Sequence, residues 1–212
     1  MRKEGDKNLN HERKKKKLLE KLVQSVIKKG TQAASFRQLA KETRVQVNTL
    51  QHYFNTKEEL MESIFAEVHE QDKEHIQDAL NLSQKNPKDA FRIFLSNISN
   101  AWFMGILSPI HELGLSIGLE NSNLGMSYIN HLLEPTLQSL EGLIDELIKL
   151  KKIRIRGDVR SAALSLLSPV FLALLHQKTL GGANCRKLDM EAFIELHITL
   201  FLSGWEINKS KR

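Results

Sequence analysis

The chain has 212 residues, of which 41% are hydrophobic and 26% are charged, a composition typical of a folded soluble protein. A single cysteine, Cys185, excludes an internal disulfide framework. The charged N-terminus lacks the apolar core of a signal peptide, so we expect a cytoplasmic protein. The most apolar run, over 162–175, is shorter than the roughly 20 residues of a membrane-spanning helix, so we expect no membrane segment.

Charge is distributed unevenly along the chain. Residues 1–57 hold 15 Lys and Arg against 5 Asp and Glu, a net of +10, whereas residues 58–212 hold 16 against 20, a net of −4. A basic front on a mildly acidic body indicates a polyanion partner for the front alone. We expect a flexible basic tail over 1–11. The run "RKKKK" that follows is either a solvated tail or an arm that strengthens phosphate contact without reading sequence.

The spacing of apolar residues predicts an almost entirely helical chain, and the first helix is expected over 14–29. Gly30 follows two lysines, which is typical of a helix C-terminus. Ser35 opens a second helix, and Gln38 three residues later completes a capping box, in which each side chain bonds the other residue's backbone N–H.

Beyond Glu42 the helical pattern breaks for about three residues and resumes with apolar residues at 47, 50 and 54. Thr56 and Glu59 then open a longer helix with a second capping box. Two short helices joined by a tight turn, held between two longer helices, are the layout of a helix-turn-helix, here over 35–54.

The second short helix carries unusual side chains for a solvated face. Lys and Glu would be the common choices, but this helix presents amides, a hydroxyl, an imidazole and a phenol, and no acidic residue occurs over 43–56. Such groups suit base edges and phosphates, and a helix that enters a DNA groove must avoid negative charge. The pattern predicts a recognition helix over Gln46 to Phe54.

This region resembles the N-terminal domain of the tetracycline-repressor (TetR) family of bacterial transcriptional regulators. The matching features are the stripe of the first helix, Gly30, "SFRQLA", Val45, "TLQHYF" and "KEEL". The resemblance implies an all-α fold in which a three-helix DNA-binding domain over 12–72 is joined by a long helix to a helical domain over 73–208. That second domain would bind an effector and form a homodimer.

Four residues depart from the family pattern. Arg44 stands in the turn where Gly is common, and a non-Gly residue in a left-handed conformation costs about 1 kcal/mol. Gln46 replaces the usual Ser at the N-cap of the recognition helix and is a weaker cap. Asn48 stands where Gly is frequent, and Gln51 where a phosphate-binding Tyr is frequent. These departures leave the operator sequence open.

Carried onto this sequence, the resemblance implies two sets of DNA contacts. Phosphates would be held by Arg37, Thr49, Tyr53 and Lys57, the last at the positive N-terminus of the long helix. The major groove would be faced by Gln46, Val47, Asn48, Gln51 and His52. Asn and Gln can pair with adenine, and Val can contact a thymine methyl group.

The rest of the chain reads as further helices. Asn86-Pro87 and Ser108-Pro109 each combine a capping residue with Pro at the first helical position, and the second of these helices is expected to reach about residue 119. A long helix over about 124–151 would be kinked at Pro135. Two further helices are expected over about 158–180 and 189–205.

The last two helices are apolar around much of their circumference, in "LSLLSPVFLALL" and "AFIELHITLFL". The resemblance implies that they pair with their copies in a four-helix dimer interface. A monomer that packs both inward is the alternative. A two-fold dimer would place its recognition helices about 34 Å apart and favour a palindromic operator.

An effector pocket would lie among the middle helices. Its candidate lining residues are Trp102, Phe103, Met104, Met126, Tyr128 and His131, although ordinary core packing explains each of them too. His111-Glu112 and His131 with Glu134 lack a third ligand, and no catalytic constellation is visible, so we expect no metal, no cofactor and no enzyme. The lone Cys185 lies in a glycine-flanked loop and gives only weak support for a redox switch.

These features together predict a DNA-binding repressor released from its operator by a small-molecule effector. The alternative is a helical small-molecule-binding or protein-interaction module that no longer reads DNA. A steep fall of DNA affinity with salt would favour the repressor.

Overall fold

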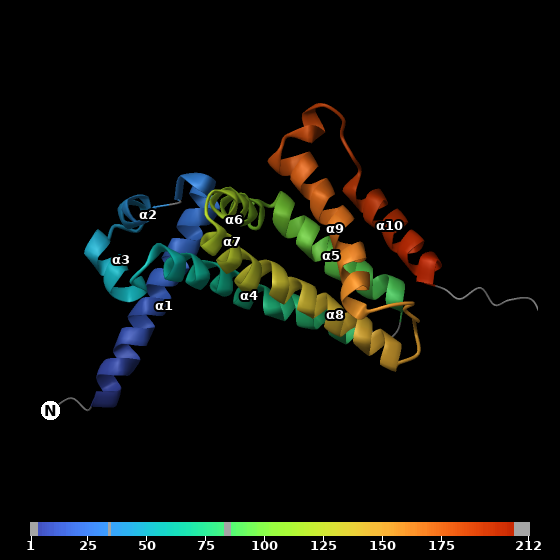
Figure 1. The fold of residues 1–212 in the computed structure, drawn as a ribbon, viewed down its shortest axis with the longest axis horizontal. Helices are drawn as coiled ribbons and strands as arrows, with labels where there is room; N and C mark the ends of the chain where they lie inside the picture. Colours follow the sequence, from blue (N-terminus) through green and yellow to red (C-terminus); the bar gives the residue numbers. More distant parts are fainter. Residues whose placement is uncertain (1–3, 34, 83–85, 206–212) are drawn as a thin grey trace, which may run out of the picture. The chain divides into compact units, whose positions relative to one another are not determined.

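The computed structural model describes residues 4–33, 35–82 and 86–205, and in these residues it contains helices and no strand (Figure 1). The helices are α1 (Glu4–Lys29), α2 (Phe36–Thr43), α3 (Val47–Phe54), α4 (Lys57–Leu82), α5 (Pro87–Phe103), α6 (Ser108–Glu120), α7 (Ser122–Tyr128), α8 (Glu134–Lys149), α9 (Val159–Leu174) and α10 (Met190–Trp205). Short 3-10 turns lie at Gly30–Ala33 and Gly182–Asn184, and π turns lie at Ile129–Leu133 and Leu175–Thr179. The all-α class is therefore confirmed.

The chain divides into two compact units. The first joins the residues up to Gln71 with Pro109–Leu132, and the second holds Asp72–Ser108 and the residues from Leu133 onward. A boundary near residue 72 was expected, but α6 and α7 were expected in the second domain and belong to the first unit instead.

Helix α1 begins ten residues earlier than the apolar stripe predicted. The expected flexible tail over 1–11 is wrong for residues 4–11, which form the first turns of this helix. Residues 4–11 read "EGDKNLNH" and contain a single apolar side chain, Leu9, so a search for apolar periodicity misses them. Leu9 is accordingly 72% exposed, and burial starts at Leu18.

The two capping boxes of the first unit are each half formed. The backbone N–H of Gln38 donates to the Ser35 hydroxyl at 3.2 Å, and that of Glu59 donates to the Thr56 hydroxyl at 3.1 Å. The reciprocal side chains point elsewhere, since Gln38 donates to the Glu42 carboxylate and Glu59 accepts from an asparagine amide. The helices begin where the sequence predicted because the first half is enough to satisfy an exposed N–H.

Helices α6 and α7 join the first unit through small residues and one large ring. A Cβ on Gly118 would lie 3.0 Å from the Gly125 Cα, so the two helices approach to backbone contact. The ring of Tyr128 lies edge-on to Phe65 of α4, with centroids 5.5 Å apart, and covers the bare Cα of Gly114. This close packing explains why α6 and α7 belong to the first unit.

The second unit is built on α5, α8, α9 and α10. The expected caps are present, since side-chain oxygens of Asn86, Asp158 and Asp189 each accept a backbone N–H at the start of their helix. The predicted break near Pro135 is a π turn at Ile129–Leu133, directly before the proline. Proline has no N–H to continue the α-helical bonding pattern, so the bonding loosens there.

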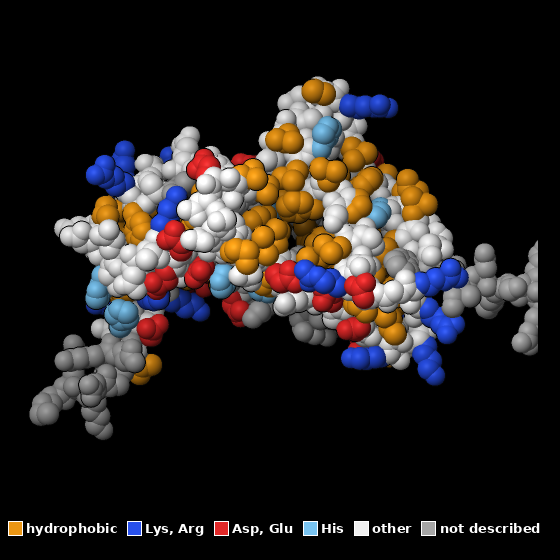
Figure 2. Space-filling view, viewed as in Figure 1, with side chains coloured by type: hydrophobic (Ala, Val, Ile, Leu, Met, Phe, Trp, Pro, Cys, Tyr) orange, Lys and Arg blue, Asp and Glu red, His pale blue; other side chains and the backbone are white. Residues whose placement is uncertain are grey.

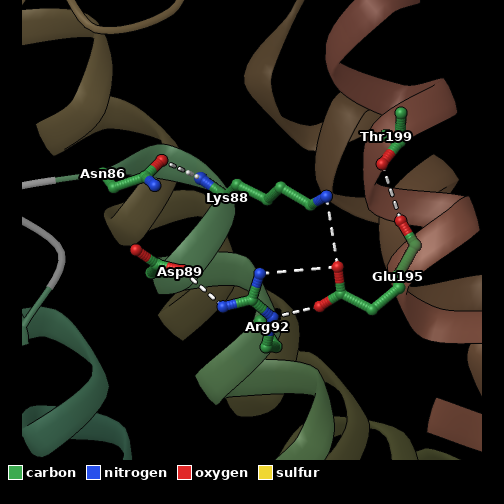
Figure 3. Close-up of polar contacts among 6 residues, drawn as sticks. All are labelled: Asn86, Lys88, Asp89, Arg92, Glu195 and Thr199. Atoms are coloured by element: carbon green, nitrogen blue, oxygen red, sulfur yellow. Dashed lines mark hydrogen bonds and ion pairs between the residues drawn. The ribbon is translucent and has the colours of Figure 1, made fainter. Parts of the chain in front are cut away.

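Charged side chains fasten α10 to α5 at one edge of the second unit (Figure 3). The guanidinium of Arg92 bonds the carboxylates of both Asp89 and Glu195, and Lys88 Nζ lies 3.1 Å from Glu195. These bonds to cations lower the pKa of the Glu195 carboxyl. The groups are partly exposed to water. Each ion pair therefore contributes less than about 1 kcal/mol to the free energy of unfolding, the upper end for surface pairs.

Helix α9 and the π turn after it form one segment, Val159–Thr179, that is long and apolar enough to cross a membrane by length and composition alone. The apolar run in the sequence was expected to be too short, but the helix extends beyond both of its ends. In the structure α9 packs against α5, α8 and α10.

Candidate nucleic-acid interface

The turn between α2 and α3 keeps a left-handed residue even though that residue is not glycine. Arg44 has φ 56° and ψ 42°, and the Val45 N–H donates to the Ala40 carbonyl at 3.0 Å. This is the usual way in which a helix C-terminus is closed by a left-handed residue. The departure from glycine therefore leaves the turn unchanged, and its cost is strain in Arg44 of about 1 kcal/mol.

Helix α3 is anchored by two fully buried side chains, Leu50 and Phe54. Of the predicted groove-facing residues, Gln46, Asn48, Gln51 and His52 are exposed, whereas Val47 is half-buried. The side chain of Gln46 makes no capping hydrogen bond at the start of the helix. The polar side chains predicted to contact bases are thus exposed to solvent on α3.

The predicted phosphate contacts come from three helices of the same unit. Arg37 is exposed on α2, Thr49 and Tyr53 are half-buried on α3, and Lys57 is the first residue of α4. The backbone N–H groups at the N-terminus of α4 add positive potential beside Lys57. All nine predicted DNA-binding residues therefore belong to one unit.

The interpretation of the sequence missed a contact between α1 and the recognition helix. The His11 ring lies 4.9 Å from the Tyr53 ring and 5.7 Å from the His52 ring, centroid to centroid. One turn further on, Lys15 Nζ lies 5.3 Å from the centroid of Phe54. Figure 2 shows histidine side chains (pale blue) at this exposed edge of the first unit. The available signal was the four-residue spacing of His11 and Lys15, which places both on one face of a helix.

The first unit also contains a buried polar pair between α6 and α7. Nδ1 of His111 and the hydroxyl of Tyr128 lie 2.6 Å apart and share a hydrogen bond. Both residues are almost fully buried, and burial lowers the pKa of His111 to about 3 and raises the pKa of Tyr128. His111 is therefore a neutral structural residue, and among the described residues no group of three ligands for a metal ion is present.

The six candidate effector contacts divide equally between the two units. Trp102, Phe103 and Met104 belong to the second unit, where Trp102 is buried edge-on to Phe171 and Met104 is 77% exposed. Met126, Tyr128 and His131 belong to the first. Trp102 and Tyr128 are buried within their units, and the role of all six residues in an effector pocket stays a prediction.

The second unit also holds an open groove of about 370 Å³ that the sequence did not indicate. It is lined by Arg156, Ser165, His197, Leu200, Phe201 and Gly204, none of which was a predicted effector contact. His197 Nε2 lies 2.9 Å from the Leu166 carbonyl, so its ring bonds α10 to α9.

Comparisons with known proteins agree with this geometry. The family model for the bacterial regulatory proteins of the tetR family matches residues 18–64. The HTH-type transcriptional regulator PksA of Bacillus subtilis (strain 168) is 32% identical over 72 residues, which are 34% of this chain and 35% of PksA. The chain thus matches only about a third of that relative's length.

Solved structures of TetR-family proteins cover nearly the whole chain. A TetR-family transcriptional regulator from Mesorhizobium loti superposes with a TM-score of 0.73 over 93% of this chain and 98% of its own, at 16% identity. The regulator FadR from Bacillus subtilis, solved with stearoyl-CoA, gives 0.61 over 89% and 98%, at 23% identity. The flavonoid-responsive regulator FrrA gives 0.64 over 91% and 96%, at 22% identity.

The outward-facing α3, its left-handed entry turn and the long α4 after it have the geometry of a helix-turn-helix. Residues 18–64 thus match the family model of the bacterial regulatory proteins of the tetR family, and the chain as a whole shares the fold of solved TetR-family structures.

Proposed function

We propose that this protein is a cytoplasmic transcriptional repressor that binds a palindromic operator as a homodimer and is released by a small-molecule effector. The main support for this proposal is the orientation of α3. Its apolar side is buried and its amide, hydroxyl and imidazole side chains point outward, within the strongly basic stretch over 1–57. Groups of this kind recognise base edges, and surrounding cations supply phosphate affinity.

The dimer would form through α9 and α10. Several leucines of these helices are exposed in the single chain, among them Leu172 (66%), Leu196 (58%) and Leu200 (60%). Figure 2 shows hydrophobic side chains (orange) over this part of the second unit. Contiguous exposed apolar side chains of this extent usually mark a protein interface. A second copy would cover them by pairing the same two helices about a two-fold axis.

Release would work by a shift of populations. Helix α4 runs without a break from the DNA-binding unit into residues of the second unit. An effector bound in the second unit that prefers one tilt of α4 would change the separation of the two recognition helices and so lower operator affinity. FadR is described with stearoyl-CoA and FrrA as flavonoid-responsive, which makes organic molecules of this size reasonable first compounds to test.

The test is a selection of duplexes from a randomised pool by the purified protein, followed by titrations at several salt concentrations. We expect a palindromic consensus, a steep decrease of affinity with salt, and weaker binding when an effector is bound. A protein that binds effectors but enriches no duplex would be the alternative, a helical binding module. Equal operator affinity with and without every bound effector would remove the release mechanism.

A further inference from the structure

We propose that the N-terminal half of α1 is a third DNA-contacting element that binds phosphates beside the recognition helix. The proposal rests on the proposed function and extends it to residues outside the helix-turn-helix. Two observations carry it: the packing of His11 on the recognition helix, and a row of cations that continues from His11 along α1.

The packing of His11 fixes where α1 lies relative to the residues that face DNA. His11 contacts the rings of both His52 and Tyr53, and the lysine one turn later lies against the Phe54 ring. His52 is exposed and Tyr53 is half-buried, so α1 meets α3 at its outer edge and not only at its buried side. The first turns of α1 therefore border the DNA-reading surface itself.

The cations of α1 continue this surface. Arg13, Lys14, Lys17 and Lys21 are all exposed, and at 100° per residue they share an arc of about 100° on one side of the helix. Lys14 is three residues from His11 and is its neighbour on the helix surface. We name these four cations the α1 basic row. The acidic side chains Glu12 and Glu20 lie beyond Arg13, on the side of the row away from His11.

Dimensions of duplex DNA favour phosphates as the partner of this row. The major groove is about 12 Å wide and is walled by phosphates, and packed helices lie about 8–10 Å apart. If α3 lies in the major groove, then α1, which packs against the edge of α3, lies beside the phosphates that border the groove. Lys and Arg there would contact phosphates and carry no sequence information. The sequence left open whether the lysine run is a solvated tail or a phosphate-binding arm. In this proposal it binds phosphates, as part of helix α1.

The test compares two variants from which the same charge is removed. One is Arg13→Gln, Lys14→Gln and Lys17→Gln in the basic row. The other replaces three exposed lysines of the second unit by glutamine, at Lys149, Lys152 and Lys178. Glutamine is as good a helix former as lysine, so α1 should stay folded, and far-UV circular dichroism checks this. Each variant and the unchanged protein are titrated with the selected operator at a series of salt concentrations.

We expect the basic-row variant to bind about ten-fold more weakly or worse at low salt, with an unchanged base preference. Its plot of log affinity against log salt should be shallower by about 0.9 for each phosphate that it no longer binds. Its hydroxyl-radical footprint should show less protection at the edge of the site, whereas the second-unit variant should match the unchanged protein. If both variants keep the original salt slope and footprint, the proposal is overturned while the repressor function stands. If the unchanged protein binds no duplex at all, both fail together.

Discussion

Arg44 shows how strongly the surrounding fold can determine the backbone conformation of one residue. It is left-handed, and Asn55 and Lys151 also have positive φ, although L-residues with a Cβ avoid positive φ. Hydrogen bonds from Arg44 and Val45 back to α2 hold the conformation. The helix-turn-helix angle thus depends on the backbone pattern and not on glycine.

Replacing Arg44 by glycine should therefore stabilise the first unit. Relief of about 1–2 kcal/mol of strain is offset by about 0.4–1 kcal/mol of extra unfolded-chain entropy, so we expect a net gain of roughly 0.5–1 kcal/mol. Urea unfolding followed by circular dichroism measures this. Lys151→Gly, at the same φ of 56° in the second unit, is the matched case and should gain a similar amount. A loss of stability in Arg44→Gly would show that the side chain has a structural role.

Substitutions of Asn48 and Lys57 should have different effects, the first on base preference and the second on phosphate binding. We expect Asn48→Ala to change which bases are preferred, because its exposed amide is a bidentate partner for adenine. Lys57→Ala should weaken binding to every sequence alike and reduce the salt slope by about 1. Titrations on a randomised operator pool measure both effects. The opposite pattern would show that the two roles are wrongly assigned.

His111 should make the protein acid-sensitive. Its pKa is about 3 in the folded chain and near 6.5 when unfolded, so between these values the unfolded state binds more protons. The contribution of neutral His111 is complete above pH 6.5 and decreases as the pH falls, by at most about 1.4 kcal/mol per unit. Unfolding measured from pH 7.5 to 5 in wild type and His111→Gln should show a steeper decline in wild type. Parallel curves would contradict this.

At the scale of elements, the helices are joined by contacts that no single helix reveals. Arg92 and Glu195 connect α5 to α10 across 103 positions of sequence. His111 and Tyr128 connect α6 to α7, and Phe65 supplies the ring against which Tyr128 packs. The assignment of α6 and α7 to the first unit follows from these contacts.

The glycine faces of α6 and α7 should be intolerant of even one methyl group. A Cβ at Gly114 would overlap ring carbons of Tyr128, so we expect Gly114→Ala to destabilise the protein by about 1–3 kcal/mol. Gly142, within α8, has open space around its Cα, and Gly142→Ala should stabilise by up to about 1 kcal/mol through helix propensity alone. Thermal unfolding of the pair measures both. Equal effects of the two substitutions would mean that the close approach is not maintained in solution.

At the scale of the whole molecule, the exposed leucines of α9 and α10 are the feature that a single chain leaves unexplained. Leucine side chains more than half exposed on both helices give the second unit an apolar surface that water solvates poorly. A two-fold partner would remove that surface and would pair two copies of the recognition helix.

Charges placed on this surface should therefore produce monomers. We expect Leu196→Glu with Leu200→Glu to dissociate the dimer and to weaken operator binding at least ten-fold, because each half-site then binds alone. Analytical ultracentrifugation gives the mass. Leu119→Glu, at an 88% exposed leucine of the first unit, is the control and should stay dimeric. A wild-type protein that sediments as a monomer would exclude the interface.

The amino-acid sequence by itself determined the helical class, the starts of the capped helices and the position of the exposed polar helix α3. These depend on signals within a few residues: apolar spacing, Ser, Asn and Asp caps such as those at Ser35 and Asp158, and the absence of acidic residues around α3. Local hydrogen bonds and the periodicity of one helix suffice to produce them, so they can be predicted without knowing the fold.

Only the tertiary structure decided how distant segments meet. The extension of α1 onto His52 and Tyr53, the grouping of α6 and α7 with the first unit, and the core roles of Trp102 and Tyr128 all depend on neighbours far along the chain. A ring in a core and a ring in a pocket have the same spacing in sequence. They differ in what packs against them, which is set by the three-dimensional arrangement of helices and not by local preference.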